Sequence, residues 1–148
     1  MPVKALVITG PTASGKTAAA ISIAKRFNGE IISADSMQIY KYMNIGTAKP
    51  DEAEKDGIPH YMLDIVEPWE EYSVAQYTEA ARRCIRDVAN RGKLPIIAGG
   101  TGLYINAIVE NIDFTSSPEI NKEVVAEIEE FYAKNGAEAL HSVLEKED

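Results

Sequence analysis

Apolar runs of strand length alternate with helical patterns along most of the chain. The runs lie at residues 3–9, 30–33, 61–66 and 94–98, and the third of them is the weakest. Between them, apolar residues recur at the three- and four-residue spacing that indicates one face of a helix. Strands that alternate with helices are typical of a parallel sheet with crossover helices, so the pattern predicts an α/β fold.

The strands and helices have recognisable faces and ends. Residues 3–9 are mostly apolar, which predicts a fully buried central strand. The first helix begins at Thr17, and its predicted buried face is Ala20, Ile23, Ala24 and Phe27. The second begins after Ser73, which forms a capping-box pattern with Gln76. Its predicted buried face is Val74, Tyr77, Ala81, Ile85 and Val88. Residues 41–59 are typical of a loop, with one exposed helical turn at 51–55.

From Thr115 onward the pattern is that of a helical hairpin. Ser117 and Pro118 are typical of a helix N-terminus, and an apolar stripe then runs as far as Asn135-Gly136. The stripe consists of Ile120, Val124, Ile128 and Phe131 or Tyr132. A second short helix is predicted at 137–144. We therefore expect an α/β core at 1–114 and an acidic helical hairpin at 115–148.

The composition is that of an ordinary globular domain, since 45% of the 148 residues are hydrophobic and 26% are charged. No apolar run approaches the ~20 residues of a membrane span, and no signal peptide is recognisable. We therefore expect no membrane association. The single cysteine, Cys84, is expected to be a packing residue in a cytoplasmic protein.

The net charge of −8 is concentrated at the C-terminal end. Residues 1–118 hold 12 Lys and Arg against 14 Asp and Glu, whereas residues 119–148 hold 3 against 9. Nothing in the sequence forms the basic stripe that marks a nucleic-acid-binding surface. A nucleic-acid partner would need a pocket, or residues other than these.

The most specific motif joins the first predicted strand to the first helix. It matches G-x-x-x-x-G-K-[ST] without a mismatch and consists of Gly10, Pro11, Thr12, Ala13, Ser14, Gly15, Lys16 and Thr17. A strand, a glycine-rich turn and a helix N-terminus in this order form a phosphate-binding loop, the P-loop. Its backbone N–H groups and the Lys16 ammonium would contact phosphate oxygens, and the Thr17 hydroxyl would ligate Mg²⁺. The motif does not identify the phosphate compound.

Two polar stretches follow other predicted strands. Asp35 comes directly after the second strand, and the glycine-rich turn around Thr101 follows the strand at 94–98. In open parallel sheets, ligands bind at the carboxyl ends of strands, so both stretches belong to the same edge as the P-loop. Asp35 has two compatible interpretations, a functional carboxylate or the N-cap of a short helix from Ser36.

Five stretches carry a resemblance to a known family. In chain order they are GPTASGKT, ISADSMQIYKYMNIGTAKP, PHYMLDIVEP, YSVAQY and AGGTGLYINAI. Together they resemble the isopentenyl-tRNA transferase family of tRNA dimethylallyltransferases, which modify adenosine beside the anticodon. The match covers residues 5–110 and continues weakly through the C-terminal hairpin. The resemblance implies a P-loop NTPase-like parallel sheet flanked by helices, with the start of a helical insertion domain at the C-terminus.

The resemblance also implies roles for individual residues. The P-loop would hold the diphosphate of dimethylallyl diphosphate rather than ATP, with Lys16 in a catalytic role and Mg²⁺ at Thr17. Asp35 would be the general base and Thr101 would position the adenine. The tRNA contacts would come from Asp35, Ser36, Met37, Gln38 and Thr101. We expect a monomer whose partners are tRNA and dimethylallyl diphosphate.

The chain departs from the family pattern in two respects. The family is about twice as long, so its later tRNA-binding helices and an arginine that helps to hold the diphosphate are not among these residues. Asn121 stands where relatives often carry an arginine. Two other classes stay open. A P-loop kinase of a nucleotide or small metabolite explains the P-loop but not the pairing of DSMQIY with GGTGLY. A binding-only module is the third interpretation.

Overall fold

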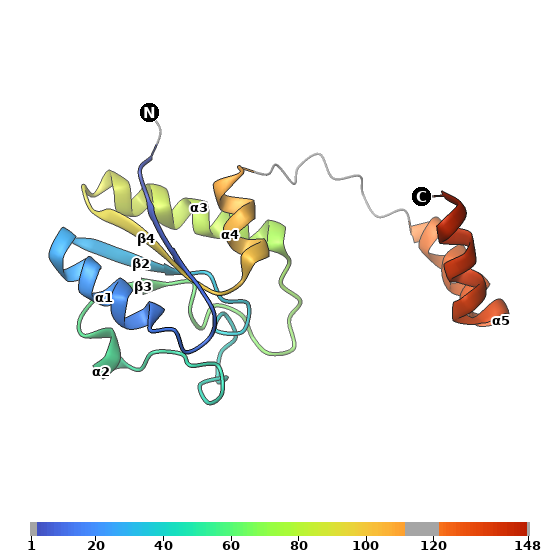
Figure 1. Ribbon diagram of the computed structural model, residues 1–148, viewed down its shortest axis with the longest axis horizontal. Coiled ribbons are helices and arrows are strands. Elements are labelled where there is room, and N and C mark those ends of the chain that lie inside the picture. Colours follow the sequence, from blue (N-terminus) through green and yellow to red (C-terminus); the bar gives the residue numbers. More distant parts are fainter. Residues whose placement is uncertain (1–2, 112–121, 148) are drawn as a thin grey trace. The chain divides into compact units, whose positions relative to one another are not determined.

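The computed structural model describes residues 3–111 and 122–147 (Figure 1). Its contacts divide the chain into two compact units, Met1–Ile112 and Asp113–Asp148. The first unit contains the sheet and all the residues of the P-loop. The second contains one helical element and is described separately below.

The first unit is built on a parallel sheet of four strands, β1 (Leu6–Thr9), β2 (Gly29–Ser33), β3 (His60–Tyr61) and β4 (Leu94–Gly99). Their order across the sheet is β1-β4-β2-β3, so β4 lies between the first two strands of the chain. In the register of the central pair, Ile31 is opposite Ile96 and Ile32 is opposite Ile97. The predicted α/β class and parallel sheet are confirmed.

Two strand predictions need correction. β1 is not a fully buried central strand, because it lies at the edge of the described sheet and pairs only with β4 there. Its residues Leu6 to Ile8 are half-buried. β3 is much shorter than the predicted strand at 61–66, because the backbone adopts positive φ at Met62 and Asp64 and leaves the sheet. Val66 then makes an isolated bridge with Tyr40.

Helix α1 (Lys16–Phe27) covers one face of the sheet. Ala20, Ile21 and Ala24 pack against Ile31 and Ile96 in one core cluster. The prediction that Phe27 belongs to this face is wrong, since its side chain is 58% exposed. The buried face of α1 includes Ile21, so it is turned slightly from the predicted face. The next buried position along the helix would be residue 28, not residue 27, and the helix ends there at Asn28, which has a left-handed backbone conformation.

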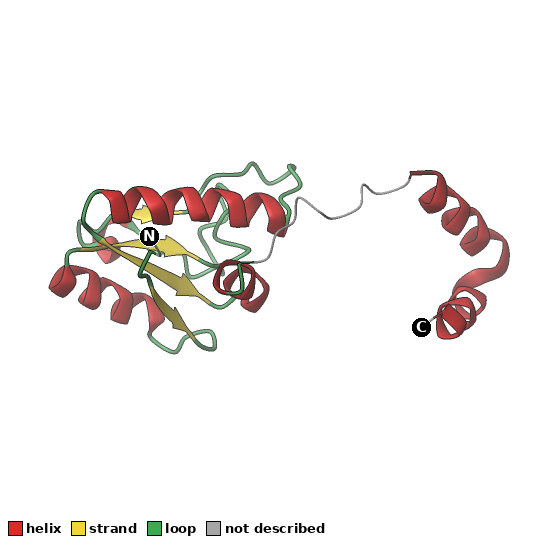
Figure 2. Ribbon diagram, turned by 90° about the horizontal axis from the view of Figure 1, so that it is seen from above, coloured by secondary structure: helices red, strands yellow, loops and turns green. Residues whose placement is uncertain are grey.

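Helices α3 (Val74–Asn90) and α4 (Gly102–Val109) cover the other face, and Figure 2 shows helices on both sides of the sheet. The predicted capping box of α3 is confirmed, because Ser73 Oγ accepts from the Gln76 amide and the Gln76 side chain accepts from the Ser73 amide. The predicted buried face is confirmed at its centre by Tyr77, Ala81, Ile85 and Val88. Cys84 is partly buried against the same cluster, as expected for a packing residue.

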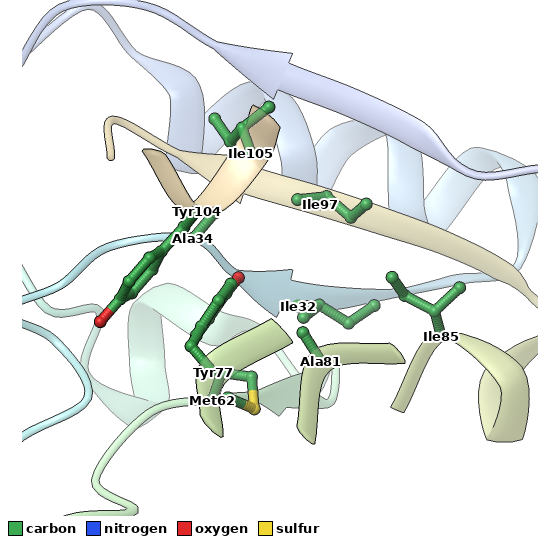
Figure 3. Packing of buried hydrophobic residues seen from close by; sticks show 9 residues of the cluster. All are labelled: Ile32, Ala34, Met62, Tyr77, Ala81, Ile85, Ile97, Tyr104 and Ile105. Carbon is green, nitrogen blue, oxygen red and sulfur yellow. The ribbon is translucent and has the colours of Figure 1, made fainter. Parts of the chain in front are cut away.

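Two stacked tyrosines join these helices to the sheet (Figure 3). The rings of Tyr77 and Tyr104 are 3.8 Å apart and inclined by 10°. Burial raises the pKa of Tyr77, and its hydroxyl donates to the carbonyl oxygen of Ser33 at 2.9 Å. This hydrogen bond fixes the carboxyl end of β2, directly before the polar stretch that follows it.

The remaining helices are α2 (Glu52–Lys55) and α5 (Lys122–Glu147). α2 is the exposed helical turn predicted at 51–55, and a capping box between Asp51 and Glu54 begins it. α5 is broken at Gly136 (φ 79°, ψ 177°), where the sequence predicts a break. The expected N-cap at Ser117 and Pro118, the start of the stripe at Ile120, and Asn121 lie outside the described residues.

Within α5 the apolar stripe lies at the surface of its own unit. The side chains of Val124 and Ile128 are each 47% exposed, and Tyr132 is 53% exposed. Among the helices at 3–111 and 122–147, none combines the length and hydropathy needed to cross a membrane.

Candidate active site

The carboxyl ends of the parallel strands border one cavity of about 530 Å³. Its walls come from the P-loop and the start of α1, from the segment after β2, from residues 47–54, and from the end of β4. The lining residues are Thr12, Ala13, Ser14, Gly15, Lys16, Thr17, Ala18, Ile21, Asp35, Gln38, Thr47, Ala48, Pro50, Glu54, Ala98, Gly99 and Gly100. Ligands bind at this edge in open parallel sheets.

The P-loop wall of the cavity ends in an uncapped helix N-terminus. Gly15 occupies the N-cap position in the left-handed region (φ 83°) and has no side chain to bond the first amides of α1. These amides, together with the positive end of the helix dipole, form an anion-binding site. The sequence places this N-terminus here because Gly10 and Gly15 let the chain turn sharply between β1 and α1.

Lys16 and Thr17 both line the cavity. The Lys16 ammonium donates to the carbonyl oxygen of Pro11 and lies 3.5 Å from Ser14 Oγ, so it lies over the loop itself. The Thr17 side chain is exposed at the start of α1. Gly10 and Pro11 shape the loop but are not lining residues.

Asp35 faces the same cavity from the end of β2. Its Oδ1 accepts from the amides of Met37 at 2.9 Å and Gln38 at 3.2 Å, so the carboxylate caps the turn that follows. The short helix expected from Ser36 is not formed, because residues 36–39 make a turn instead. Within the described part of the chain, Oδ2 receives no hydrogen bond. One oxygen therefore holds the turn while the other is available to a ligand.

The second glycine-rich turn fixes the segment that carries Asp35. The Thr101 amide donates to the Ala34 carbonyl oxygen at 3.0 Å, and Thr101 Oγ1 accepts from the Ser36 amide at 2.9 Å. The Thr101 hydroxyl also donates to Ser36 Oγ at 3.3 Å. Thr101, Ser36 and Met37 are not lining residues of the cavity, and Met37 is 46% exposed. The predicted tRNA-contacting set is thus divided, with only Asp35 and Gln38 facing the cavity.

Residues 47–54 form a wall that sequence reasoning missed. Thr47, Ala48, Pro50 and Glu54 line the cavity from a stretch for which the sequence predicts a loop with one exposed helical turn, and no part in the site. The only local signal for this stretch is the pair Gly46 and Pro50. The pair predicts a turn but not the part of the protein against which the turn packs.

His60 lies beside this site in a smaller hollow lined by Thr17, Ser33 and Gln38, among others. Its Nδ1 lies 2.7 Å from the carbonyl oxygen of Ile58, an acceptor, so Nδ1 carries the proton. Burial lowers the pKa of the ring, so the imidazole is neutral at pH 7. Nε2 is buried without a partner among the residues that the structure describes.

The IPP transferase family model matches residues 38–148 of the chain. This chain belongs to the IPP transferase family. It is 58% identical over 143 residues to a tRNA dimethylallyltransferase of Acetivibrio thermocellus, covering 97% of this chain and 45% of that relative. It is 52% identical over 148 residues to the enzyme of the same name from Thermoanaerobacter sp., covering 100% of this chain and 47% of the relative.

Two solved structures are similar to this chain in both sequence and fold. The full-length tRNA isopentenylpyrophosphate transferase of Bacillus halodurans is 44% identical, with a TM-score of 0.77 over 99% of this chain and 48% of that one. A eukaryotic dimethylallyltransferase acting on tRNA is 35% identical, with a TM-score of 0.77 over 86% of this chain and 32% of that one. The predicted P-loop NTPase-like fold and the family resemblance are confirmed. The chain spans about half the length of the curated relatives it matches.

Proposed function

We propose that the full natural chain transfers a dimethylallyl group from dimethylallyl diphosphate to N6 of an adenosine next to the tRNA anticodon. The observation that supports this most is the position of Asp35, which lines one cavity together with the P-loop N-terminus of α1. A site for diphosphate and a carboxylate for the amine thus border a single space. We also propose that the protein acts as a monomer in the cytoplasm.

The P-loop has the groups that a departing diphosphate requires. As the bond between C1 of the prenyl group and the diphosphate oxygen breaks, negative charge concentrates on the leaving group. Backbone amides of residues 12–17 and the Lys16 ammonium stabilise that charge where it develops. To do so Lys16 exchanges its bond to the Pro11 carbonyl oxygen for one to a phosphate oxygen.

Mg²⁺ fits this donor set as an ion held largely by the substrate. No group of three or more His, Cys, Asp or Glu side chains within residues 3–111 and 122–147 can hold a metal ion by itself. Mg²⁺ keeps several waters and commonly binds through phosphates and one or two protein oxygens. The Thr17 hydroxyl at the cavity wall is the protein oxygen that we assign to it. When bound, the ion adds positive charge at the diphosphate.

Asp35 is assigned to the nucleophile side. The exocyclic N6 is a weak nucleophile because its lone pair is delocalised into the adenine ring. Asp35 Oδ2 accepts a hydrogen bond from N6, orients it, and takes its proton as the N6–C1 bond forms and diphosphate leaves. The capping bonds on Oδ1 keep the carboxylate in place during this step. Thr101 acts on the same segment through Ser36, and we propose that it helps to position the adenine.

A binding experiment tests the diphosphate assignment against the kinase alternative. In the full natural chain, dimethylallyl diphosphate should displace labelled inorganic diphosphate at lower concentration than ATP does. Lys16→Ala should weaken diphosphate binding by at least about tenfold, because a charge-assisted contact worth about 1.5 kcal/mol or more is lost. The control is Lys25→Ala near the other end of α1, an exposed lysine paired with Asp56. Tighter binding of ATP, or an unchanged affinity in Lys16→Ala, contradicts the proposal.

A further inference from the structure

Part of the cavity wall comes from a strained segment, residues 44–50. Thr47, Ala48 and Pro50 of this segment line the cavity. Gly46 has φ 82° and Ala48 has φ 50°, and the second of these is a left-handed conformation that a residue with a Cβ rarely adopts. Such a conformation persists only where surrounding contacts determine it, so other residues must hold this segment in place.

Lys49 is the first of these contacts. Its side chain is only 5% exposed, and its ammonium lies within hydrogen-bond distance of three acceptors. They are the Tyr40 carbonyl oxygen at 2.7 Å, Asp64 Oδ1 at 2.6 Å and Asn44 Oδ1 at 3.2 Å. An ammonium has three protons to donate, so Lys49 is fully used inside the protein. It acts as an internal brace and is not free to bind phosphate.

Gln38 is the second residue that holds this segment. Its Nε2 donates to the carbonyl oxygens of Thr47 at 3.0 Å and Ala48 at 3.1 Å. Its Oε1 accepts from the Ser33 hydroxyl at 3.1 Å. The amide therefore connects the end of β2 to the two wall residues, including the strained one. Because both Nε2 protons are donated to backbone oxygens, the Gln38 side chain has no proton to donate to a nucleic-acid base.

We propose that Lys49 and Gln38 are positioning residues that hold segment 44–50 as the wall for the hydrocarbon part of the prenyl diphosphate. The P-loop amides provide for the phosphates. Beyond the P-loop the lining is mixed: its apolar members include Ile21, Ala48, Pro50 and Ala98, beside the polar Asp35, Gln38, Thr47 and Glu54. A five-carbon chain excluded from water by these apolar residues is bound through its apolar area. This inference rests on the proposed function.

The test compares Lys49→Met and Gln38→Leu in the full natural chain. Each should raise the KM for dimethylallyl diphosphate by about tenfold while kcat stays within about threefold, because the wall contacts the ligand equally in the ground and transition states. The affinity for inorganic diphosphate should change by less than about twofold, since the P-loop is untouched. The double variant should resemble the single variants, because both residues act through one segment.

The matched control is Lys25→Met, which removes an exposed lysine paired with Asp56 and should leave all these values unchanged. If Lys49→Met fails to fold, Gln38→Leu decides, since it removes no charge. An unchanged KM for dimethylallyl diphosphate, a rise confined to the KM for tRNA, or an equal loss of inorganic diphosphate binding overturns the inference. Wild type that binds inorganic diphosphate as tightly as the prenyl compound also overturns the inference, whereas wild type that binds ATP more tightly than dimethylallyl diphosphate contradicts the proposed function instead.

Discussion

At the scale of single residues, the site depends on side chains and glycines that each satisfy a local structural need. Asp35 caps a turn through Oδ1 and also lines the cavity. The two interpretations that its sequence position allows are therefore not exclusive. In the proposed mechanism the capping bonds hold the carboxylate in one orientation before the substrate arrives, which is what general-base catalysis requires.

Gly99 is the residue whose replacement should disturb this arrangement most directly. A Cβ at Gly99 would lie 2.2 Å from the Ala34 carbonyl oxygen and 2.8 Å from Ala34 Cα, and backbone atoms cannot rotate away. The end of β2, with Asp35 beside it, would have to move. We expect Gly99→Ala to lower the free energy of unfolding in urea by about 1–3 kcal/mol.

Gly102 provides the matched control for that substitution. It lies only three residues further on, begins α4, and has no atom within 4 Å of an added Cβ. Gly102→Ala should be neutral or stabilise the protein by up to about 1 kcal/mol, because alanine favours a helix. Equal unfolding free energies for the two variants would show that the close approach at Gly99 is unimportant.

At the scale of elements, one buried carboxylate connects β2 with β3 and with the turn between α3 and β4. Glu30 of β2 is 1% exposed and accepts from Arg91 after α3 at 2.6 and 2.7 Å. Tyr61 of β3 donates to it at 2.7 Å, and Lys93 before β4 also contacts it. These bonds hold together three strands and a helix at the opposite end of β2 from Asp35.

This network predicts a specific acid sensitivity. Hydrogen bonding from Arg91, supported by Lys93 and Tyr61, lowers the pKa of Glu30 from 4.5 to about 2 despite burial. Glu30 therefore binds a proton more tightly in the unfolded chain than in the folded protein. Its contribution to the free energy of unfolding is complete above pH 4.5 and is lost as the pH falls toward 2.

Urea unfolding at pH 6 and pH 2.5 measures this contribution. Wild type should lose on the order of 2 kcal/mol more than Glu30→Gln between these two pH values. Glu79→Gln, which removes an exposed carboxylate paired with Arg83 on α3, is the control and should follow the wild type. Parallel pH profiles for wild type and Glu30→Gln would contradict the assigned role.

Elements with a local signal could be predicted from the sequence. The strand, glycines and helix of the P-loop follow each other within a few residues, and the capping box of α3 needs only Ser73 and Gln76. The sheet order could not be predicted, because the pairing of β4 between β1 and β2 joins residues far apart in the chain. The prediction for Phe27 is wrong because the apolar spacing in this helix fits two neighbouring faces, one that includes Phe27 and one that includes Ile21, and the second is the buried one.

Segment 44–50 is the part of the candidate site that could not be predicted from the sequence. Its conformation depends on the amide of Gln38 and the ammonium of Lys49, which bond to backbone oxygens and to Asp64. Such bonds leave no periodic pattern in the sequence. Pattern and motif locate the P-loop and Asp35, whereas the part of the lining at 47–50 is identified only from the three-dimensional structure.

At the scale of the whole molecule, all the described residues that line the cavity lie in the first unit, and the chain covers 45–47% of the two curated relatives. Ligand binding tests the cavity, and the full natural chain is the protein in which to measure it. Group transfer to tRNA is a property proposed for the full natural chain, so it has to be measured there. The two properties are separable, and a decisive experiment should record both.

The central claim is that Asp35 and the P-loop form one prenyl-transfer site, and single-turnover kinetics of Asp35→Asn test it. Asparagine keeps an oxygen that can cap the turn, so folding and diphosphate affinity should match wild type. Its amide oxygen is too weak a base to take the N6 proton, so the rate of transfer from dimethylallyl diphosphate to tRNA should fall by about 100-fold or more. A rate within about threefold of wild type, with diphosphate affinity unchanged, would contradict the account and leave Asp35 as a cap alone.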